Sequence, residues 1–358
     1  MGSEPPDAAP WDRMRPPKDR DFVETLEGLL FCLVGYVHPP DRYTAYLKYT
    51  PAETGKWARD RVFYCRNLPY YHVRNVVATL EFLERHHPRY VWLDPVRGLR
   101  FSFVPKDAVA TYYVPEDRLA EIMEQPHDPL EEQVRDLVDV LASAAGIPVG
   151  AMGVTGSILL KLHDPSFSDI DVTVYGRENA LKVKRAVEVS KGRLFEALEP
   201  ERRERWRTET AERFALSRED VAHLETRRWN YFLFRGRYVS VHPTKRDDEI
   251  RERYGDERSR IVGVASIEAT VVEAGESLFL PAVYRLGDVS VLDGPVGEIR
   301  EIVSFEGLYG DIADPGDRIV ARGQVEELSG GSRRLVVGTS ALADGGFVRV
   351  KRALARPL

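Results

Sequence analysis

The chain has 358 residues and a formal net charge of −6, and 43% of its residues are hydrophobic and 30% charged. Its length predicts two or three domains of roughly 100–200 residues each, and its composition excludes global disorder. No apolar run approaches the roughly 20 residues of a membrane-spanning helix, so we expect no membrane partner. The negative charge argues against nonspecific nucleic-acid binding by the whole surface, but it is compatible with a local basic patch.

The N-terminal segment and the cysteines predict a cytoplasmic protein. Residues 1–20 are rich in proline and charge and lack the apolar stretch of a secretory signal, which predicts a disordered tail. The sequence has two cysteines, Cys32 and Cys65, which excludes a disulfide framework and an all-cysteine zinc site. We interpret them as buried thiols in a reducing compartment.

Residues 21–126 are expected to form an N-terminal α+β domain. Five apolar residues share one face between Val73 and His86, and Pro88 follows, so a helix is predicted over this range. Apolar runs and alternation predict strands at residues 29–37, 43–49, 90–93 and 99–104. Aromatic and basic side chains also interleave here, which suits stacking on a single-stranded nucleic acid, although buried strands show the same pattern. These side chains are Arg42, Tyr43, Tyr46, Lys48, Tyr49, Tyr64, Arg66, Tyr70, Tyr71, His72 and Arg74.

Residues 127–258 are expected to form a middle domain. Asp128 is a typical helix N-cap, Pro129 suits the first helical position, and Gly146 ends the predicted helix. The remaining expected elements are a turn at residues 153–157, a strand at 170–175, helices at 178–190 and within 199–228, and a hairpin at 231–242.

Residues 259–358 are expected to form a C-terminal β-rich domain. Helical periodicity vanishes, and short strands separated by Gly, Asp and Pro predict a small barrel or sandwich. The strand candidates are residues 262–272, 289–292, 299–305, 319–325 and 335–337. Basic residues outnumber acidic ones by four over residues 318–352. This excess suits a barrel that holds RNA, and a packing or dimerisation module is an equally good interpretation.

Two carboxylates are separated by one residue at the start of the strand predicted over residues 170–175. Alternation places Asp169 and Asp171 on one face and turns Val172 and Val174 into a core. Adjacent carboxylates repel each other unless a cation neutralises them, and hard oxygen ligands suit Mg²⁺ or Mn²⁺. The spacing therefore predicts a divalent-metal site.

A glycine and a serine precede these carboxylates by one short helix. Gly156 lets the backbone approach a phosphate closely, and Ser157 can donate hydrogen bonds to it. A phosphate-binding turn beside a metal site is typical of enzymes that catalyse phosphoryl or nucleotidyl transfer.

Gly-Ser, followed about ten residues later by Ser-Asp-x-Asp on a strand, resembles the motif of the DNA polymerase beta-like nucleotidyltransferase superfamily. The matching residues are Gly156, Ser157, Ser168, Asp169 and Asp171. The wider chain looks like a group of archaeal predicted nucleotidyltransferases that share the blocks DRDFVETLEGLLFCLVGYVHPPDRYTAYLKY, GVTGSILL and SDIDVTVYGRENALKVK. The resemblance implies an α/β (α+β) fold with a mixed sheet and helices on one side. Here the N-terminal α+β block and the C-terminal β-barrel-like module would flank it.

The resemblance also implies the activity and the site. A Mg²⁺-dependent enzyme would transfer a nucleoside monophosphate from an NTP to a hydroxyl acceptor and release pyrophosphate. Asp169 and Asp171 would be the catalytic metal ligands. Gly156, Ser157, Ser168 and Lys161 would bind the nucleotide. Lys161 and His163 lie near the loop before the strand, where a contact with the triphosphate competes with a solvated role.

The sequence departs from the superfamily at its third carboxylate, which is usually found on a later strand. The strand over residues 238–242 holds Ser240 and His242 and no acidic residue. Three interpretations follow: Asp247, Asp248, Glu249 or Glu225 reaches the site; His242 serves as the base; or catalysis is impaired. In the last case the chain would be a nucleic-acid-binding or scaffold module. For an active enzyme the acceptor is an RNA end, a protein hydroxyl or a small molecule, with RNA slightly favoured, and the oligomeric state is open.

Overall fold

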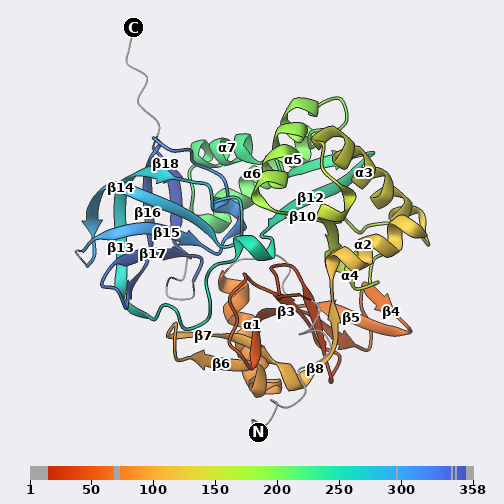
Figure 1. Ribbon diagram of the computed structural model, residues 1–358, viewed down its shortest axis with the longest axis horizontal. Helices are drawn as coiled ribbons and strands as arrows, with labels where there is room; N and C mark the ends of the chain where they lie inside the picture. The colour runs from red at the N-terminus through yellow and green to blue at the C-terminus, as the bar shows by residue number, and fades with distance from the viewer. Residues whose placement is uncertain (1–14, 68–72, 296, 340–341, 343–344, 352–358) are drawn as a thin grey trace.

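A computed structural model describes residues 15–67, 73–295, 297–339, 342 and 345–351. Figure 1 shows three modules around a common centre: an N-terminal sheet module, a middle helix-and-sheet module and a C-terminal β-module. The architecture is mixed α+β, which confirms the coarse prediction of fold class.

The N-terminal module is built on one large, mostly antiparallel sheet. Its strands run in the order β4-β5-β3-β2-β1-β8, and β7 pairs with both β3 and β6. The predicted helix is confirmed as α1. The elements are β1 (Phe22–Thr25), β2 (Leu30–Leu33), β3 (Arg42–Ala52), β4 (Trp57–Arg59), β5 (Val62–Arg66), α1 (Val73–His86), β6 (Val91–Asp94), β7 (Leu99–Pro105) and β8 (Val109–Tyr113). The sequence patterns missed β1, β4, β5 and β8, because these strands are short and carry few alternating apolar residues.

The segment before β1 corrects one prediction. Residues 1–14 of the predicted disordered tail lie outside the described residues, but residues 15–20 are packed against the protein. Lys18 pairs with Asp247, and Asp21 is fully buried and pairs with Arg15 at 2.7 Å. Partners distant in the sequence neutralise these charges, so the charged composition of the segment does not make it disordered.

The middle module is a four-stranded mixed sheet in the order β11-β12-β10-β9, with β10 and β12 parallel. Its elements are α2 (Pro115–Glu124), α3 (Pro129–Ala145), β9 (Met152–Thr155), α4 (Gly156–Leu159), β10 (Ile170–Tyr175), α5 (Arg177–Ser190), α6 (Pro200–Phe214), α7 (Arg218–Arg227), β11 (Tyr231–Phe234) and β12 (Arg237–Thr244). The predicted caps of α3 are confirmed: Asp128 accepts from the backbone of Leu130 and Glu131, and Gly146 ends the helix with φ 63°.

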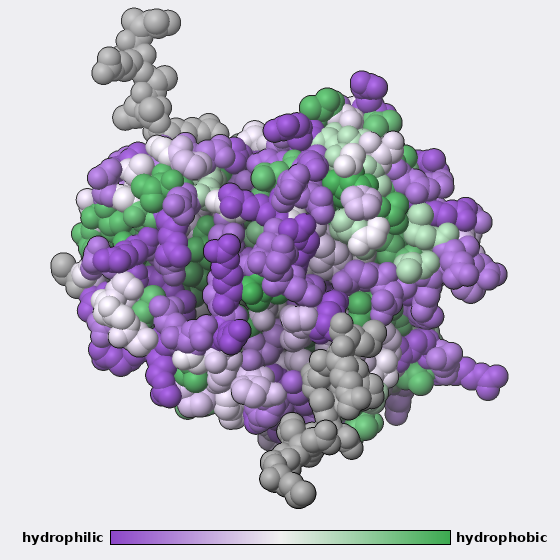
Figure 2. Space-filling model, in the orientation of Figure 1, coloured by the Kyte–Doolittle hydropathy of each residue, from purple (hydrophilic) through white to green (hydrophobic). Residues whose placement is uncertain are grey.

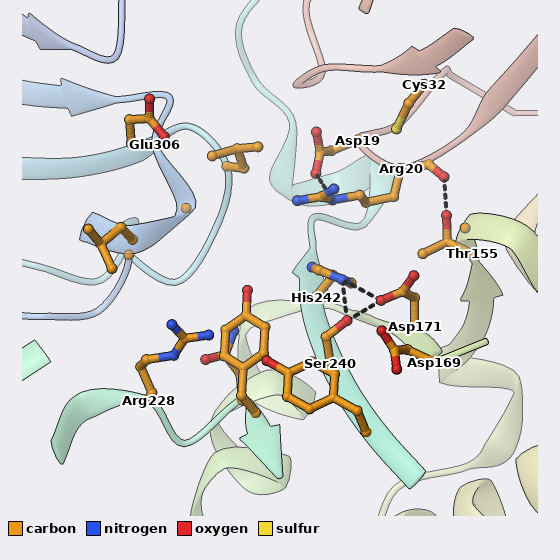
Figure 3. Close-up of a pocket in the computed structure, with 18 of the residues that line it drawn as sticks. Asp19, Arg20, Cys32, Thr155, Asp169, Asp171, Arg228, Ser240, His242 and Glu306 are labelled. Atoms are coloured by element: carbon orange, nitrogen blue, oxygen red, sulfur yellow. Dashed lines mark hydrogen bonds and ion pairs between the residues drawn. The ribbon is translucent and has the colours of Figure 1, made fainter. Parts of the chain in front are cut away.

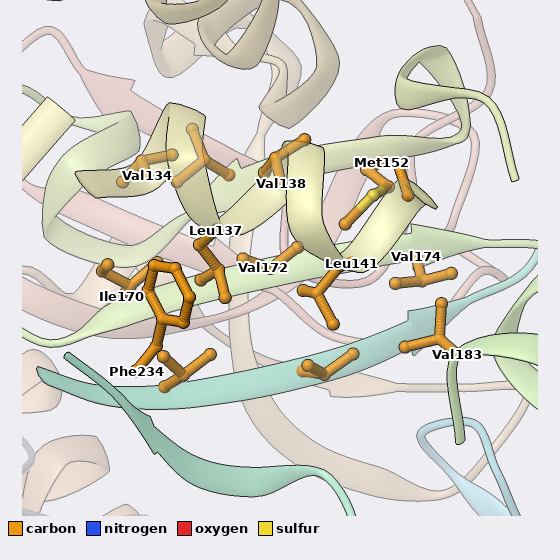
Figure 4. Packing of buried hydrophobic residues seen from close by; sticks show 14 of the residues in the cluster. Val134, Leu137, Val138, Leu141, Met152, Ile170, Val172, Val174, Val183 and Phe234 are labelled. Atoms are coloured by element: carbon orange, nitrogen blue, oxygen red, sulfur yellow. The ribbon is translucent and has the colours of Figure 1, made fainter. Parts of the chain in front are cut away.

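One face of this sheet carries the module's hydrophobic core. Leu137 and Leu141 of α3 lie against Val172 and Val174 of β10 (Figure 4), and all four are fully buried. Because side chains alternate along a strand, the opposite face of β10 is left free for polar residues. Helix α2 also joins this core through Leu119 and Ile122, so the module begins before the boundary predicted at residue 127.

The C-terminal module is a β-barrel. β13 pairs with both β14 and β16, and the path β13-β14-β15-β17-β16 returns to β13. Its strands are β13 (Ser259–Glu273), β14 (Ala282–Asp293), β15 (Ile299–Ser304), β16 (Arg318–Leu328), β17 (Arg333–Val337) and β18 (Phe347–Val350). Phe214 and Leu224, from α6 and α7, are part of the barrel's core cluster, so these helices fasten the barrel to the middle module.

The surface is predominantly hydrophilic on the face seen in Figure 2, with small scattered hydrophobic groups. Within the described residues no helix has the length and apolar character needed to cross a bilayer.

Candidate functional site

A cavity of about 350 Å³ lies where the three modules meet. The N-terminal module contributes one wall, the polar face of the middle sheet forms another, and the barrel segment after β15 forms a third. Figure 3 shows this convergence around Asp171. The charged lining residues are Asp19, Arg20, Lys48, Arg66, Asp169, Asp171, Arg213, Arg227, Arg228, His242 and Glu306.

Asp169 and Asp171 lie in this cavity on the same side of the sheet, as predicted from alternation. Ile170 and Val172, which alternate with them, are fully buried on the other side. Burial and the negative charge of Asp171 raise the pKa of Asp169 to about 6. Burial also raises the pKa of Asp171, but hydrogen bonds from His242 and Ser240 and the charge of Lys48 outweigh it, so that pKa is well below its usual range. The pair therefore resists holding two negative charges without a cation.

The turn at Gly156 touches the carboxylate of Asp171. Gly156 has φ +68°, and a Cβ at this position would overlap the Asp171 Oδ2 atom. Thr155, just before it on β9, is the register partner of Asp171 on β10. Only glycine satisfies both the left-handed backbone and this close approach.

Ser240 and His242 occupy the part of β12 that faces the carboxylates. Ser240 is the register partner of Asp171 in the parallel pairing. Its hydroxyl donates to Asp171 Oδ1 and lies 2.9 Å from His242 Nε2, which is 3.6 Å from Asp171 Oδ1. Burial and the nearby charge of Arg20 lower the pKa of His242, although its contacts with Asp171 act in the opposite direction.

The acidic residues considered for the third position are engaged elsewhere. Glu225 accepts hydrogen bonds from Arg203 and Arg207 at 2.6 and 2.5 Å. Asp247 pairs with Lys18, Asp248 pairs with Arg246, and Glu249 accepts from the backbone of Arg177 and Arg246. None of the four lines the cavity. Of the candidates named from the sequence, His242 is the one that the fold brings to the carboxylates.

The remaining predicted nucleotide ligands lie outside the cavity lining. Lys161 is 3.0 Å from Glu121, and the buried Ser168 hydroxyl accepts from the backbone of Asp164 at 2.9 Å. Ser157 is half-buried on α4 and is likewise not a lining residue. His163 is held by Asp128 at 2.7 Å. Of the four residues predicted to bind the nucleotide, Gly156 is the one that lines the cavity.

Sequence patterns missed several residues of the site. Arg20 falls within the predicted tail, although it is the second residue of one of the blocks shared with the resembling group. Lys48 and Arg66 belong to the aromatic and basic pattern of the N-terminal domain, and this pattern does not predict that they lie near the carboxylates. Burial and the charge of Arg66 lower the pKa of Lys48 to about 7. Arg228, which lies 3.8 Å from the ring centre of Tyr231 and 4.3 Å from that of Trp206, had no local signal at all.

Two sequence patterns suggested nucleic-acid binding: the aromatic and basic residues of the N-terminal domain and the basic residues of the barrel. In the structure, most of these side chains are buried or ion-paired. Tyr43, Tyr46, Tyr49 and Tyr64 are buried, so they are core residues and not stacking platforms, while residues 70–72 lie outside the described residues. Five basic residues of the barrel are ion-paired. The pairs are Arg318–Glu268, Arg333–Glu327, Arg334–Glu326, Arg349–Asp220 and Lys351–Glu268.

A second cluster has metal-ligating side chains, namely Asp128, Glu131 and His163. Asp128 already caps α3, and Arg118 pairs with the buried Glu131. An ion there would have to displace the guanidinium, so we interpret this cluster as a structural network.

Comparison with known proteins adds a relative. The chain is 32% identical over 346 residues to "Uncharacterized protein MJ1086" of the archaeon Methanocaldococcus jannaschii, and the match covers 93% of this chain and 98% of the relative. The chain therefore belongs to the same family as that protein. No family model matches the chain. No solved structure matches it either. The archaeal source of this relative fits the archaeal origin expected from the sequence blocks.

Proposed function

We propose that the protein is a Mg²⁺- or Mn²⁺-dependent nucleotidyltransferase of the DNA polymerase beta-like superfamily, acting in the cytoplasm. It would transfer a nucleoside monophosphate from an NTP to a hydroxyl acceptor. The observation that carries this proposal is the contact between the Gly156 turn and Asp171, with Asp169 on the same side of the sheet. The mixed sheet with α3 and α5 on one face supports it.

The donor set of the cavity fits a hard divalent cation. Asp169 and Asp171 offer carboxylate oxygens, and the Ser240 hydroxyl lies beside them. Burial and the charge of Asp171 raise the pKa of Asp169, and a cation beside both carboxylates would offset this repulsion. A bound Mg²⁺ would balance the charge of the two carboxylates and act as a Lewis acid on the phosphate oxygens.

The proposed reaction requires a group that takes the proton of the acceptor hydroxyl. The acceptor oxygen forms a bond to the α-phosphorus while the bond from that phosphorus to the bridging oxygen breaks, and pyrophosphate leaves. The acceptor hydroxyl loses its proton in this step. His242 has a pKa lowered by burial and lines the cavity beside Asp171, so it is the group placed to take that proton.

The test removes one carboxylate at a time. Asp169→Asn and Asp171→Asn keep the shape of the side chain and are expected to abolish Mg²⁺-dependent transfer of label from α-labelled NTPs. Asp139→Asn, on the exposed side of α3, is the matched control and should keep full activity. Unchanged transfer in either cavity variant would refute the proposal.

A second candidate is a nucleotide-binding protein of the same fold without turnover. The presence of Ser240 and His242 where the superfamily carries its third carboxylate favours it. Binding of NTP and Mg²⁺ with no pyrophosphate release for any acceptor class would support this alternative. For an active enzyme, the ion pairs weaken the case for RNA binding on the barrel, and the acceptor is an RNA end, a protein hydroxyl or a small molecule, with RNA slightly favoured.

A further inference from the structure

Three cations from the N-terminal module line the cavity across from the carboxylates. Arg20 comes from the segment before β1, Lys48 from β3, and Arg66 from the end of β5. Among the described residues, Lys48 and Arg66 have no carboxylate within 4 Å, and Arg20 pairs with Asp19 at 3.3 Å. A divalent ion would balance Asp169 and Asp171, which leaves these cations with an excess of positive charge.

Arg20 is held in place with unusual backbone geometry. Its φ is +73°, a left-handed value that is costly for a residue with a side chain. Its carbonyl accepts a 2.7 Å hydrogen bond from Thr155, the residue that pairs with Asp171, and Asp19 accepts from the Gly35 backbone at 3.0 Å. Strain that persists in this way is typical of functional positions, and it fixes the arginine relative to the metal-binding strand.

The Arg20 side chain is directed into the cavity. Figure 3 shows its guanidinium between Asp19 and the ring of His242. Its buried Nε lies 3.3 Å from Asp19 Oδ2, but no hydrogen bond from this atom is formed within the described part of the chain. An anionic ligand in the cavity would add charge-assisted hydrogen bonds to the guanidinium.

We propose that the N-terminal module forms a phosphate subsite in which Arg20, Lys48 and Arg66 bind a phosphate chain or phosphoryl group facing the carboxylate pair. This inference rests on the proposed function, because it places the ligand in the same cavity. The phosphates come either from the triphosphate of the nucleotide or from a phosphorylated acceptor. In both cases the N-terminal module is part of the active site.

The test measures binding without metal, by calorimetry with tripolyphosphate in EDTA. Arg20→Ala and Arg66→Ala are each expected to weaken binding by about tenfold or more, because charge-assisted hydrogen bonds are lost. Arg20→Lys, which keeps the charge but not the fork, should bind with intermediate affinity. Arg85→Ala, on the exposed part of α1, is the matched control and should bind like the wild type. Thermal unfolding of each variant verifies that it is folded.

Two further arms identify the source of the phosphate. Parallel losses for tripolyphosphate and Mg²⁺-ATP would support the subsite and assign it to the nucleotide. A loss confined to glycerol phosphate, a phosphomonoester probe, would support it and assign it to the acceptor. Equal affinity of the folded variants and the control for all three probes would overturn it.

The Asp169→Asn variant separates this inference from the proposed function. Without metal it should bind tripolyphosphate more tightly than the wild type, since a negative charge is removed, although its transfer activity is lost. Loss of binding in the arginine variants of a protein that never releases pyrophosphate would refute the proposed function alone. Pyrophosphate release that is unaffected in those variants would refute the subsite alone.

Discussion

The N-terminal wall of the cavity and the C-terminal barrel carry similar basic side chains in different electrostatic settings. On the barrel, Arg318, Arg333 and Arg334 each lie within 3 Å of a glutamate oxygen. In the cavity, Lys48 and Arg66 have no such partner among the described residues. A count of basic residues along the sequence therefore does not locate an anion site. What matters is whether the fold supplies the opposing charge itself or leaves it to a ligand.

The largest loss of transfer activity is expected when Gly156, which lines the cavity, is replaced. Gly156→Ala should lower transfer by roughly a hundredfold and stability by about 1–3 kcal/mol, since the methyl group meets Asp171 and the backbone is left-handed. Gly331→Ala, in the β16–β17 turn of the barrel, also has positive φ but open space around it. It should lose stability and keep activity. Equal losses of activity in the two variants would remove the special role of the turn.

A smaller effect is expected when a cation is removed from each region. Lys48→Met should weaken tripolyphosphate binding about tenfold at pH 6, whereas Arg318→Ala on the barrel should change it less than about twofold and cost less than about 1 kcal/mol of stability. Calorimetry on both variants and the wild type checks this. A similar loss of affinity in both would break the comparison.

The pH dependence of that effect has a definite sign. The pKa of Lys48 is about 7, lowered by burial and by Arg66, with Arg20 adding and Cys32 and Asp171 opposing. Above pH 7 the lysine of the free protein is neutral and must take up a proton to bind phosphate. The ratio of wild-type to Lys48→Met affinity should therefore shrink from pH 6 to pH 8. A ratio that stays constant over this range would contradict the prediction.

The smallest effect concerns the stability of the metal-free protein. The pKa of Asp169 is raised from 3.8 to about 6, so the folded protein holds this proton more tightly than the unfolded chain. The stabilisation that the folded protein gains from protonated Asp169 is fully present below pH 3.8, and it is lost as the pH rises through 6. Asp169→Asn should thus melt about 1–3 °C above the wild type at pH 7.5 in EDTA, and this difference should vanish near pH 4. A variant that melts below the wild type at pH 7.5 would show that Asp169 has a stabilising structural role.

Much of the local structure follows from short-range patterns in the sequence. The caps at Asp128 and Gly146 and the apolar stripe of α3 predict that helix closely, because capping and periodicity act within a few residues. The Ile170–Tyr175 alternation likewise predicts which face of β10 carries the acids. Edge strands such as β4 escaped prediction because pairing, and not periodicity, defines them.

Local sequence patterns are sufficient to predict most helices and strands of the middle module, the shared face of Asp169 and Asp171, and the glycine turn before them. Contacts between modules bring Arg20, Lys48 and Arg66 opposite those acids, strand register brings Ser240 and His242 beside Asp171, and packing leaves Lys161 and Ser168 outside the cavity lining. The physical reason is range. Alternation and capping are set by neighbours along the chain, whereas the partner of a charge is chosen by strand register and by packing between modules.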